Sequence, residues 1–215
     1  MRTVTIELFT FDELTTDKAR ERARQWYRNA SAGDNSFSEF VIDAAREWLT
    51  ALGFADIDIR FSGFWCQGDG ASFTGTYSAA RRNADALAKL RADRPATYTD
   101  DAGTVHPCAG NAPWHELAAR FDKIAADAPG LVATLRDNGS HYVHPHSVAI
   151  ECDDDAPVSG APVMCDEFRA ACRSAMVQIY RELEDAYNWE NSDDYIDDTL
   201  RANEYEFTAE GVRHD

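Results

Sequence analysis

The sequence lacks the features of a secreted, membrane-spanning or disulfide-bonded protein. Its first 20 residues contain no cationic stretch followed by an apolar one, which predicts no signal peptide. No window approaches about 18 consecutive apolar residues, which predicts no membrane span. The five cysteines form no CxxC pair and are odd in number, which argues against a disulfide framework. We therefore expect a cytoplasmic protein whose cysteines are small buried hydrophobic side chains.

Basic residues are scarce as well. The 215 residues include 21 Lys and Arg against 38 Asp and Glu, for a formal net charge of −17, and three of those 21 are lysines. A chain this acidic is repelled by phosphate backbones and anionic lipid, so we expect no direct binding to nucleic acid or to a membrane surface. The bias toward Asp and Arg is also typical of a GC-rich or salt-adapted origin, in which surface carboxylates have no functional role.

The hydrophobic pattern predicts an α+β fold. Apolar residues at helical spacing predict helices over residues 17–30, 38–53, 81–91, 113–127, 164–187 and 192–202. Alternating apolar residues predict strands over residues 4–11, 56–64, 71–78, 131–137, 141–152 and 204–208. We expect one domain over residues 1–215, with an antiparallel sheet of about five or six strands and helices packed mainly on one face. Its apolar and aromatic content would allow a homodimer.

The loop SGFWCQGDGASF, residues 62–73, is the most unusual stretch of the sequence. Its three glycines allow positive φ angles and close approach of another backbone, and it lacks the signatures of a P-loop and of GxGxxG. A turn of this kind can hold a carboxylate and an amide beside stacking rings, which suits a nucleobase or another flat ligand. The alternative is a plain hairpin turn whose Asp binds nearby backbone amides. The candidate ligand-binding residues are Phe64, Trp65, Gln67, Asp69 and Phe73.

No catalytic signature can be assembled from the sequence. Cys66 would need His144 as a base and Asp69 to orient it, and nothing in the sequence brings the three together. His144 and His146 share one face of a predicted strand, where Asp69 or Asp153 could complete a zinc or manganese site. Partly exposed strand histidines are the plainer interpretation. We expect a binding protein rather than an enzyme, with no catalytic residues, no metal and no cofactor.

The negative charge is concentrated in the last third of the chain. The predicted helical portion of residues 151–215 holds 18 acidic and five basic residues. Carboxylates three or four residues apart on a helix lie about 5–6 Å from each other, which is of the order of the phosphate spacing in a nucleic-acid strand. Such a row predicts binding to a basic protein, and the alternative is a solvated face that keeps the protein soluble. This acidic row consists of Glu182, Asp185, Glu190, Asp193, Asp194, Asp197 and Asp198.

Two segments resemble a known family. SGFWCQGDGASFTG (residues 62–75) and RANEYEFTAEGVR (residues 201–213) are similar to small proteins of tailed phages and prophages, often labelled antitoxins of toxin–antitoxin stability systems. The order of elements is similar over most of the chain. The resemblance implies a phage accessory protein that acts in the host cytoplasm on host or defence machinery, and it implies no particular catalytic residues.

Two functions are therefore predicted. The first is an acidic phage-type inhibitor that uses the acidic row to bind a basic host or defence protein, either a nucleic-acid-binding protein or a toxin. The second is a protein that binds a nucleotide or another small molecule at the 62–73 loop, and sequesters or cleaves it. A phosphorylated ligand would need arginines or a metal to offset the net acidity, and Arg60, Arg81 and Arg82 are candidates. A structural or assembly role is a third interpretation.

Overall fold

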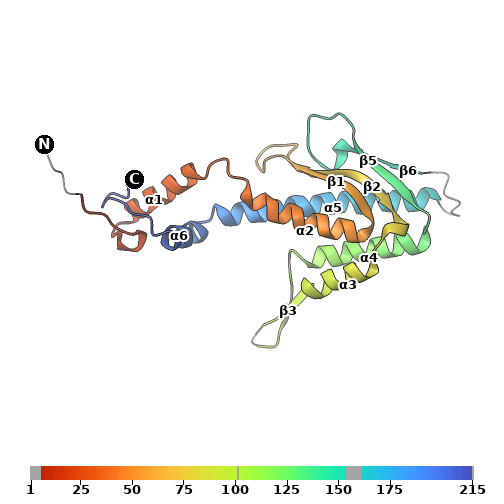
Figure 1. Ribbon diagram of the computed structural model, residues 1–215, viewed down its shortest axis with the longest axis horizontal. Helices are drawn as coiled ribbons and strands as arrows, with labels where there is room; N and C mark the ends of the chain where they lie inside the picture. Colours follow the sequence, from red (N-terminus) through yellow and green to blue (C-terminus); the bar gives the residue numbers. More distant parts are fainter. Residues whose placement is uncertain (1–5, 101, 154–160, 215) are drawn as a thin grey trace. The chain divides into compact units, whose positions relative to one another are not determined.

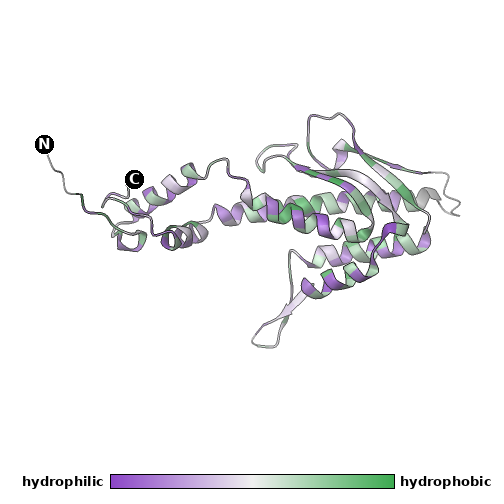
Figure 2. Ribbon diagram, in the orientation of Figure 1, coloured by the Kyte–Doolittle hydropathy of each residue, from purple (hydrophilic) through white to green (hydrophobic). Residues whose placement is uncertain are grey.

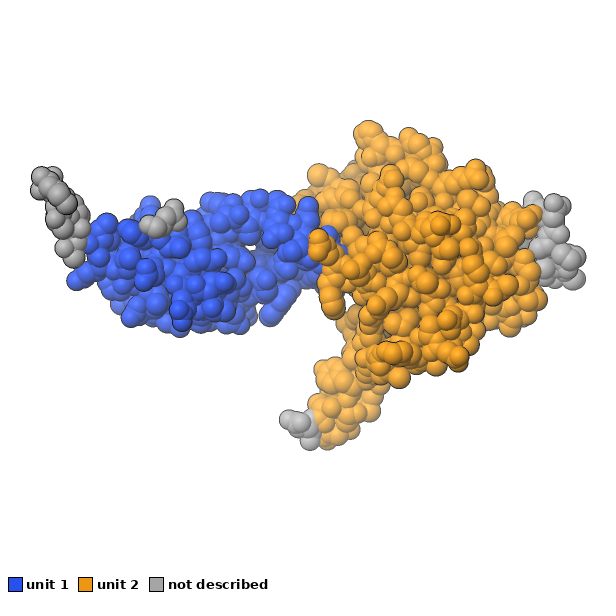
Figure 3. Space-filling model, in the orientation of Figure 1, with its two compact units in different colours: residues 1–38, 185–215 blue, residues 39–184 orange. Residues whose placement is uncertain are grey.

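The computed structural model describes residues 6–100, 102–153 and 161–214 (Figure 1). It confirms the α+β class. The described chain divides into two compact units, residues 1–38 with 185–215 (unit 1) and residues 39–184 (unit 2) (Figure 3). This division does not test the prediction that residues 1–215 form one domain, which stays a prediction. No helix of the described residues is long and apolar enough to cross a membrane.

Unit 2 contains a four-stranded antiparallel sheet with the strand order β1-β2-β5-β6. The strands are β1 (Phe54–Phe61), β2 (Ala71–Ser78), β5 (Val132–Asp137) and β6 (Val148–Cys152). Their alternation is the one read from the sequence, since Ile59, Phe73 and Leu135 are buried on the face that packs against helices. The sheet has fewer strands than the five or six expected, because the described parts of the segments 4–11 and 204–208 form only isolated bridges.

A separate hairpin consists of β3 (Thr97–Thr99) and β4 (Val105–Pro107) and lies between the helices predicted over residues 81–91 and 113–127, where no strand was predicted. The carboxylate of Asp100 stabilises its turn by accepting hydrogen bonds from the backbone N–H groups of Ala102, at 3.0 Å, and Thr104, at 2.8 Å. Each strand has three residues, too few for an alternating pattern to be recognised in the sequence.

The described residues form six α-helices, and those of unit 2 pack against its sheet. The helices are α1 (Asp17–Ala30), α2 (Ser36–Leu52), α3 (Ala84–Asp93), α4 (Ala112–Asp127), α5 (Ala161–Glu190) and α6 (Asp193–Ala202). In unit 2 the ring of Tyr77, from β2, is buried between two helices. Its centroid lies 6.1 Å from the ring centroid of Phe121 in α4 and 4.6 Å from that of Phe168 in α5. Trp48 of α2 and Trp114 of α4 stack at 5.9 Å. These aromatic pairs, each worth about 0.5–1.5 kcal/mol beyond burial, hold α4 and α5 against the sheet. Figure 2 shows hydrophobic residues gathered in α2 and the strands.

Unit 1 packs α1 against α6 around a small apolar core. The N-terminal segment and the segment after α6 meet in isolated bridges that pair Phe9 with Phe207 and Phe207 with Arg213. The strands predicted over residues 4–11 and 204–208 are therefore wrong for their described parts, because pairing stops after single residues. The chain instead forms a 3₁₀ turn at Phe11–Glu13, capped by the Glu13 carboxylate on the backbone N–H of Thr10 at 2.8 Å. The core consists of Phe11, Leu14, Ala19, Ala23, Ile196, Leu200 and Phe207.

Gly211 packs against the backbone of Ala19 with no room for a Cβ, and we predict that Gly211→Ala destabilises unit 1 by about 2–4 kcal/mol. A Cβ at this position would lie 2.0 Å from the carbonyl oxygen of Ala19, and its φ of +78° disfavours any L side chain by about 1–2 kcal/mol. Amide hydrogen exchange in α1 and α6 measures the loss.

Gly33→Ala is the matched control, because Gly33 also has a positive φ of +92° but nothing within 4 Å of an added Cβ. In this variant the free energy of unfolding of unit 1 should fall by about 1 kcal/mol, which is the conformational cost alone. Equal losses in the two variants would show that the contact with Ala19 contributes nothing.

Candidate functional site

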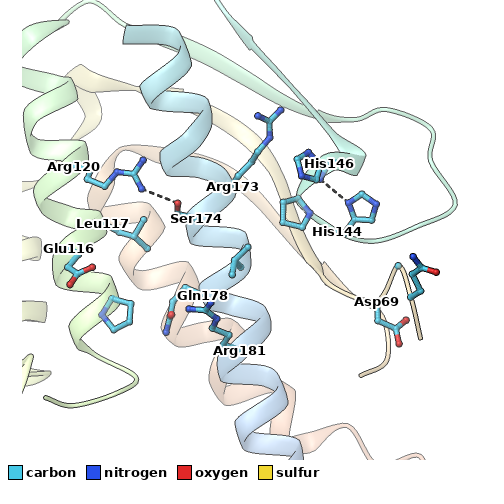
Figure 4. A pocket seen from close by; sticks show the side chains of 15 residues that line it. Asp69, Glu116, Leu117, Arg120, His144, His146, Arg173, Ser174, Gln178 and Arg181 are labelled. Atoms are coloured by element: carbon cyan, nitrogen blue, oxygen red, sulfur yellow. Dashed lines mark hydrogen bonds between the residues drawn. The ribbon is translucent and has the colours of Figure 1, made fainter. Parts of the chain in front are cut away.

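A cleft of about 830 Å³ in unit 2 is the candidate site (Figure 4). It is bounded by α4, by α5, by the loop of residues 62–70 between β1 and β2, and by the loop of residues 138–147 between β5 and β6. Its volume is in the range of small-molecule sites. The side chains that carry polar or charged groups into its lining are Gln67, Asp69, Glu116, Arg120, His144, His146, Arg173, Ser174, Gln178 and Arg181.

The loop of residues 62–70 is closed by hydrogen bonds of its own. One carboxylate oxygen of Asp69 accepts from the backbone N–H of Trp65, at 2.9 Å, and of Cys66, at 2.7 Å. This is the arrangement expected for the alternative interpretation of the loop, a hairpin turn whose Asp binds nearby backbone amides. Tyr180 of α5 donates a hydrogen bond from its hydroxyl to the carbonyl oxygen of Gly63, at 3.2 Å. The loop is thus a fixed wall of the cleft, and Asp69 both shapes the turn and lines the cleft.

The glycines of this loop allow the second loop to pack directly on the first. At Gly68, whose φ is +105°, a Cβ would lie 2.6 Å from a ring carbon of Tyr142. At Gly70, a Cβ would lie 2.8 Å from the carbonyl oxygen of Val143 and 2.9 Å from the Cβ of His144. The close backbone approach predicted for these glycines is therefore made by the chain itself, and it brings His144 to the cleft.

The strand predicted over residues 141–152 is wrong in its first half, because β6 begins at Val148 and a 3₁₀ turn occupies Pro145–Ser147. His144 and His146 therefore do not share a strand face. The Nδ1 atom of His144 accepts a hydrogen bond from the backbone N–H of His146 at 2.9 Å. The neutral ring of His144 consequently carries its proton on Nε2 and can donate it to a ligand.

The catalytic arrangement considered for Cys66 is not formed. The Asp69 carboxylate bonds to backbone amides, and the Nδ1 atom of His144, which an orienting carboxylate would bond, is taken by His146. Within residues 6–100, 102–153 and 161–214, no group of three or more His, Cys, Asp or Glu residues could hold a metal ion. The chemistry of the cleft therefore comes from its other charged groups.

Three arginines that the sequence analysis did not single out carry that charge. Arg120 of α4 donates to Glu167, at 2.9 Å, and to the hydroxyl of Ser174, at 3.0 Å. Arg173 and Arg181 of α5 have no carboxylate within 4.0 Å in the part of the chain that the structure describes, and the Nε of Arg173 is buried there without a hydrogen-bond partner. Their spacing of eight residues, about two helical turns, was the signal available in the sequence.

The charges of the cleft are unevenly distributed along it. Figure 4 shows, in the upper part of the view, Arg120 and Ser174 on one side of α5 and Arg173, His144 and His146 on its other side. Gln178, Arg181 and Asp69 lie in the lower part, where cationic, anionic and amide groups are mixed. One end of the cleft is therefore suited to an anionic group, and the other to a polar group that both donates and accepts hydrogen bonds.

The predicted ligand-binding residues divide into two groups. Gln67 and Asp69 line the cleft. Phe73 is fully buried and packs edge to face on Phe54 at 5.3 Å. Phe64 packs on Tyr180 at 5.6 Å, and Trp65 is 77% exposed. None of the three aromatic residues predicted to stack on a ligand lines the cleft. Phe73 belongs to the core, Phe64 anchors the loop and Trp65 lies on the surface.

The acidic row is largely engaged within the protein. In unit 1 both oxygens of Asp197 accept from Arg24, at 2.7 and 2.8 Å, and these hydrogen bonds raise the pKa of Arg24. Asp193 pairs with Arg28 in the same unit. A nucleic-acid-like row predicts free carboxylates, so a basic partner would have to compete with these internal arginines.

Two further members of the row also have partners. Asp198 accepts from Arg201 at 3.0 Å, and Glu182, in unit 2, accepts from the Trp114 indole at 2.8 Å and from the Gln178 amide at 2.9 Å. No ion pair is found among the described residues for the remaining three members, Asp185, Glu190 and Asp194. The row is therefore not one uniform surface.

The chain belongs to the DUF8835 family, a domain of unknown function whose family model matches residues 37–193. No curated protein matches the chain, and no solved structure matches it. Every residue that lines the cleft lies within the matched range. The resemblance to phage proteins stays a prediction.

We predict that Gly70→Ala displaces the loop of residues 138–147, because its Cβ would meet backbone and side-chain atoms of that loop at 2.8–3.0 Å. The expected cost is about 1–3 kcal/mol of stability, together with a shift of the His144 ring resonances. Gly63→Ala is the control, since its Cβ would approach the Asp69 carboxylate no closer than 3.4 Å. An unshifted His144 in Gly70→Ala would contradict the packing described.

Asp197→Asn should weaken unit 1 by about 1–3 kcal/mol, because it removes the closest of the three carboxylates that pair with the part-buried Arg24. The side chains of this pair are 20% and 15% exposed, so solvent screens it incompletely. Hydrogen exchange in α1 and α6 measures the change, with the exposed Asp194→Asn as a control that stays within about 0.5 kcal/mol. Equal effects would mean that the row is a solvated face throughout.

Proposed function

We propose that this protein binds a small phosphate-bearing molecule, with a nucleotide as the best match, in the cleft of unit 2. The observation that carries the proposal is the pair Arg173 and Arg181, which line the cleft without a carboxylate within 4.0 Å among the described residues. Among the described residues of this acidic chain, ten arginines pair with Asp or Glu. Unpaired guanidinium groups at a concave surface favour an anionic ligand as the missing counter-charge.

The phosphate is best accommodated at the end of the cleft that holds Arg120 and Arg173. Guanidinium groups match phosphate oxygens with paired N–H donors, and the Nε2–H of His144 adds a further donor. The Arg120 guanidinium is already oriented by Glu167 and Ser174, which lowers the entropy lost on binding. These arginines supply the positive charge that the net acidity of the chain makes necessary, whereas Arg60 and Arg82 are paired with carboxylates elsewhere.

The remainder of the ligand would lie toward Gln67 and Gln178. Gln178 is 5% exposed and uses its amide N–H₂ on Glu182 and on the carbonyl of Gly110, so its amide oxygen is the group left to accept a hydrogen bond. Leu117 and Val177 add apolar residues to the lining of the cleft. A heterocycle with donor and acceptor groups on its edge suits this end, which supports a nucleotide over inorganic phosphate.

Binding is the activity that this geometry supports, and cleavage is not proposed. A nucleophile held by a base is needed for covalent catalysis. Cys66 does not line the cleft, and the Asp69 carboxylate and the Nδ1 atom of His144 accept hydrogen bonds from backbone N–H groups. A second candidate function, the acidic phage-type inhibitor of a basic host or defence protein, retains the support of Asp185, Glu190 and Asp194, which have no ion pair among the described residues. The two functions can coexist because they use different residues.

Calorimetric titration with nucleoside 5′-monophosphates tests the proposed site. We expect saturable binding that weakens at high salt, and at least about tenfold weaker binding, or about 1.4 kcal/mol, for Arg173→Gln and for Arg181→Gln. Loss of a charged hydrogen-bond donor accounts for a change of that size. Arg173→Lys should restore part of the affinity, because it keeps the charge and loses the paired donors.

Arg136→Gln is the matched control, since Arg136 is an exposed arginine of β5 that does not line the cleft. It should bind like the wild type. Absence of binding for the whole nucleotide panel and for inorganic phosphate would overturn the proposal, as would equal binding by the wild type and the three cleft variants.

A further inference from the structure

Unit 1 contains a second cavity, of about 360 Å³, that the proposed nucleotide site does not include. It is formed by the end of α1, the loop of residues 31–35, the first residues of α2, the end of α5 and the start of α6. All of its lining residues belong to unit 1. Its side chains include three tyrosines, two carboxylates, two amides and one arginine: Tyr27, Tyr187, Tyr195, Asp34, Glu190, Asn35, Asn191 and Arg28.

The tyrosines are held in place by other aromatic residues. Tyr187 packs edge to face on Phe37, with ring centroids 5.6 Å apart, and Tyr195 packs in the same manner on Trp189 at 6.1 Å. Burial raises the pKa of Tyr27, and the neighbouring Tyr195 contributes to the same shift. The cavity therefore has fixed aromatic walls, and the faces of such rings attract cations.

The carboxylates of the cavity have no cation of their own in the described chain. Glu190 has neither an ion pair nor a hydrogen bond within the described residues, and burial beside Asp34 raises its pKa. Asp34 accepts a hydrogen bond from the backbone N–H of Ser36 at 2.9 Å. The remaining charge, Arg28, is already paired with Glu21 and Asp193. Two carboxylates thus face a tyrosine-walled cavity without neutralisation.

We infer that this cavity binds a guanidinium group. A guanidinium is planar, carries five N–H donors in a fixed fork, pairs with carboxylates and stacks on aromatic faces, so it can use Glu190, Asp34 and the tyrosine rings together. Its source is either the arginine side chain of a protein partner or a free arginine-like molecule. The inference does not depend on the proposed cleft ligand. It assigns to Glu190, a member of the acidic row, one definite contact.

Calorimetric titration of the full chain with Nα-acetyl-arginine amide and with its neutral isostere, Nα-acetyl-citrulline amide, tests the inference. We expect saturable binding of the arginine compound and at least about tenfold weaker binding of the citrulline compound, because the two differ in the charge and one donor group. Glu190→Gln and Tyr187→Leu should each weaken binding of the arginine compound at least about fivefold. Asp194→Asn, an exposed carboxylate outside the cavity, should not change it.

Free arginine distinguishes the two sources of the ligand. If the capped compound binds as well as free arginine, the site reads the side chain alone and fits a protein partner. If free arginine binds much more tightly, the site also reads the α-amino or carboxylate group and fits a free molecule. No binding of either compound would overturn the inference. Equal binding of the arginine and citrulline compounds would overturn it too, as would unchanged binding by Glu190→Gln in a unit whose hydrogen exchange is native.

Discussion

The packing of one loop on another is the contact on which the candidate site depends. The loop of residues 138–147 lies on the loop of residues 62–70 so closely that Gly68 and Gly70 leave no room for a side chain. Asp69 fixes the first loop by capping its backbone, and Tyr180 ties that loop to α5. The same contact therefore places His144 beside the arginines of α5, and it turns two ordinary connections into the walls of a cleft.

Internal pairing determines which charges of this acidic protein are available. Carboxylates of the acidic row are engaged by Arg24, Arg28 and Arg201, whereas Arg173 and Arg181 have no carboxylate partner among the described residues. A net charge of −17 would suggest a surface that repels anions everywhere. The structure nevertheless places two arginines without a described carboxylate partner in one cleft, where they can attract an anion. Net charge therefore says little about the preference of a single site.

The sequence predicted the local features of this fold better than its long-range ones. The bounds of α1 and α6, and the alternation of apolar and polar residues in β1, follow from neighbouring residues, and the structure has them. The prediction that His144 and His146 share one face of a strand was wrong, because a 3₁₀ turn stabilised by Ser147 interrupts the expected strand. The convergence of the cleft arginines could not be predicted, because it depends on how α4, α5 and two loops come together.

The most direct test of the account is where a nucleotide contacts the protein. Two-dimensional NMR of the isotopically labelled full chain, titrated with a nucleoside 5′-monophosphate, reports this at each backbone amide. The account predicts saturable shifts that cluster at Gln67–Asp69, at His144–Ser147 and along α5 from Arg173 to Arg181. Shifts confined to unit 1, or shifts that do not saturate anywhere, would contradict it.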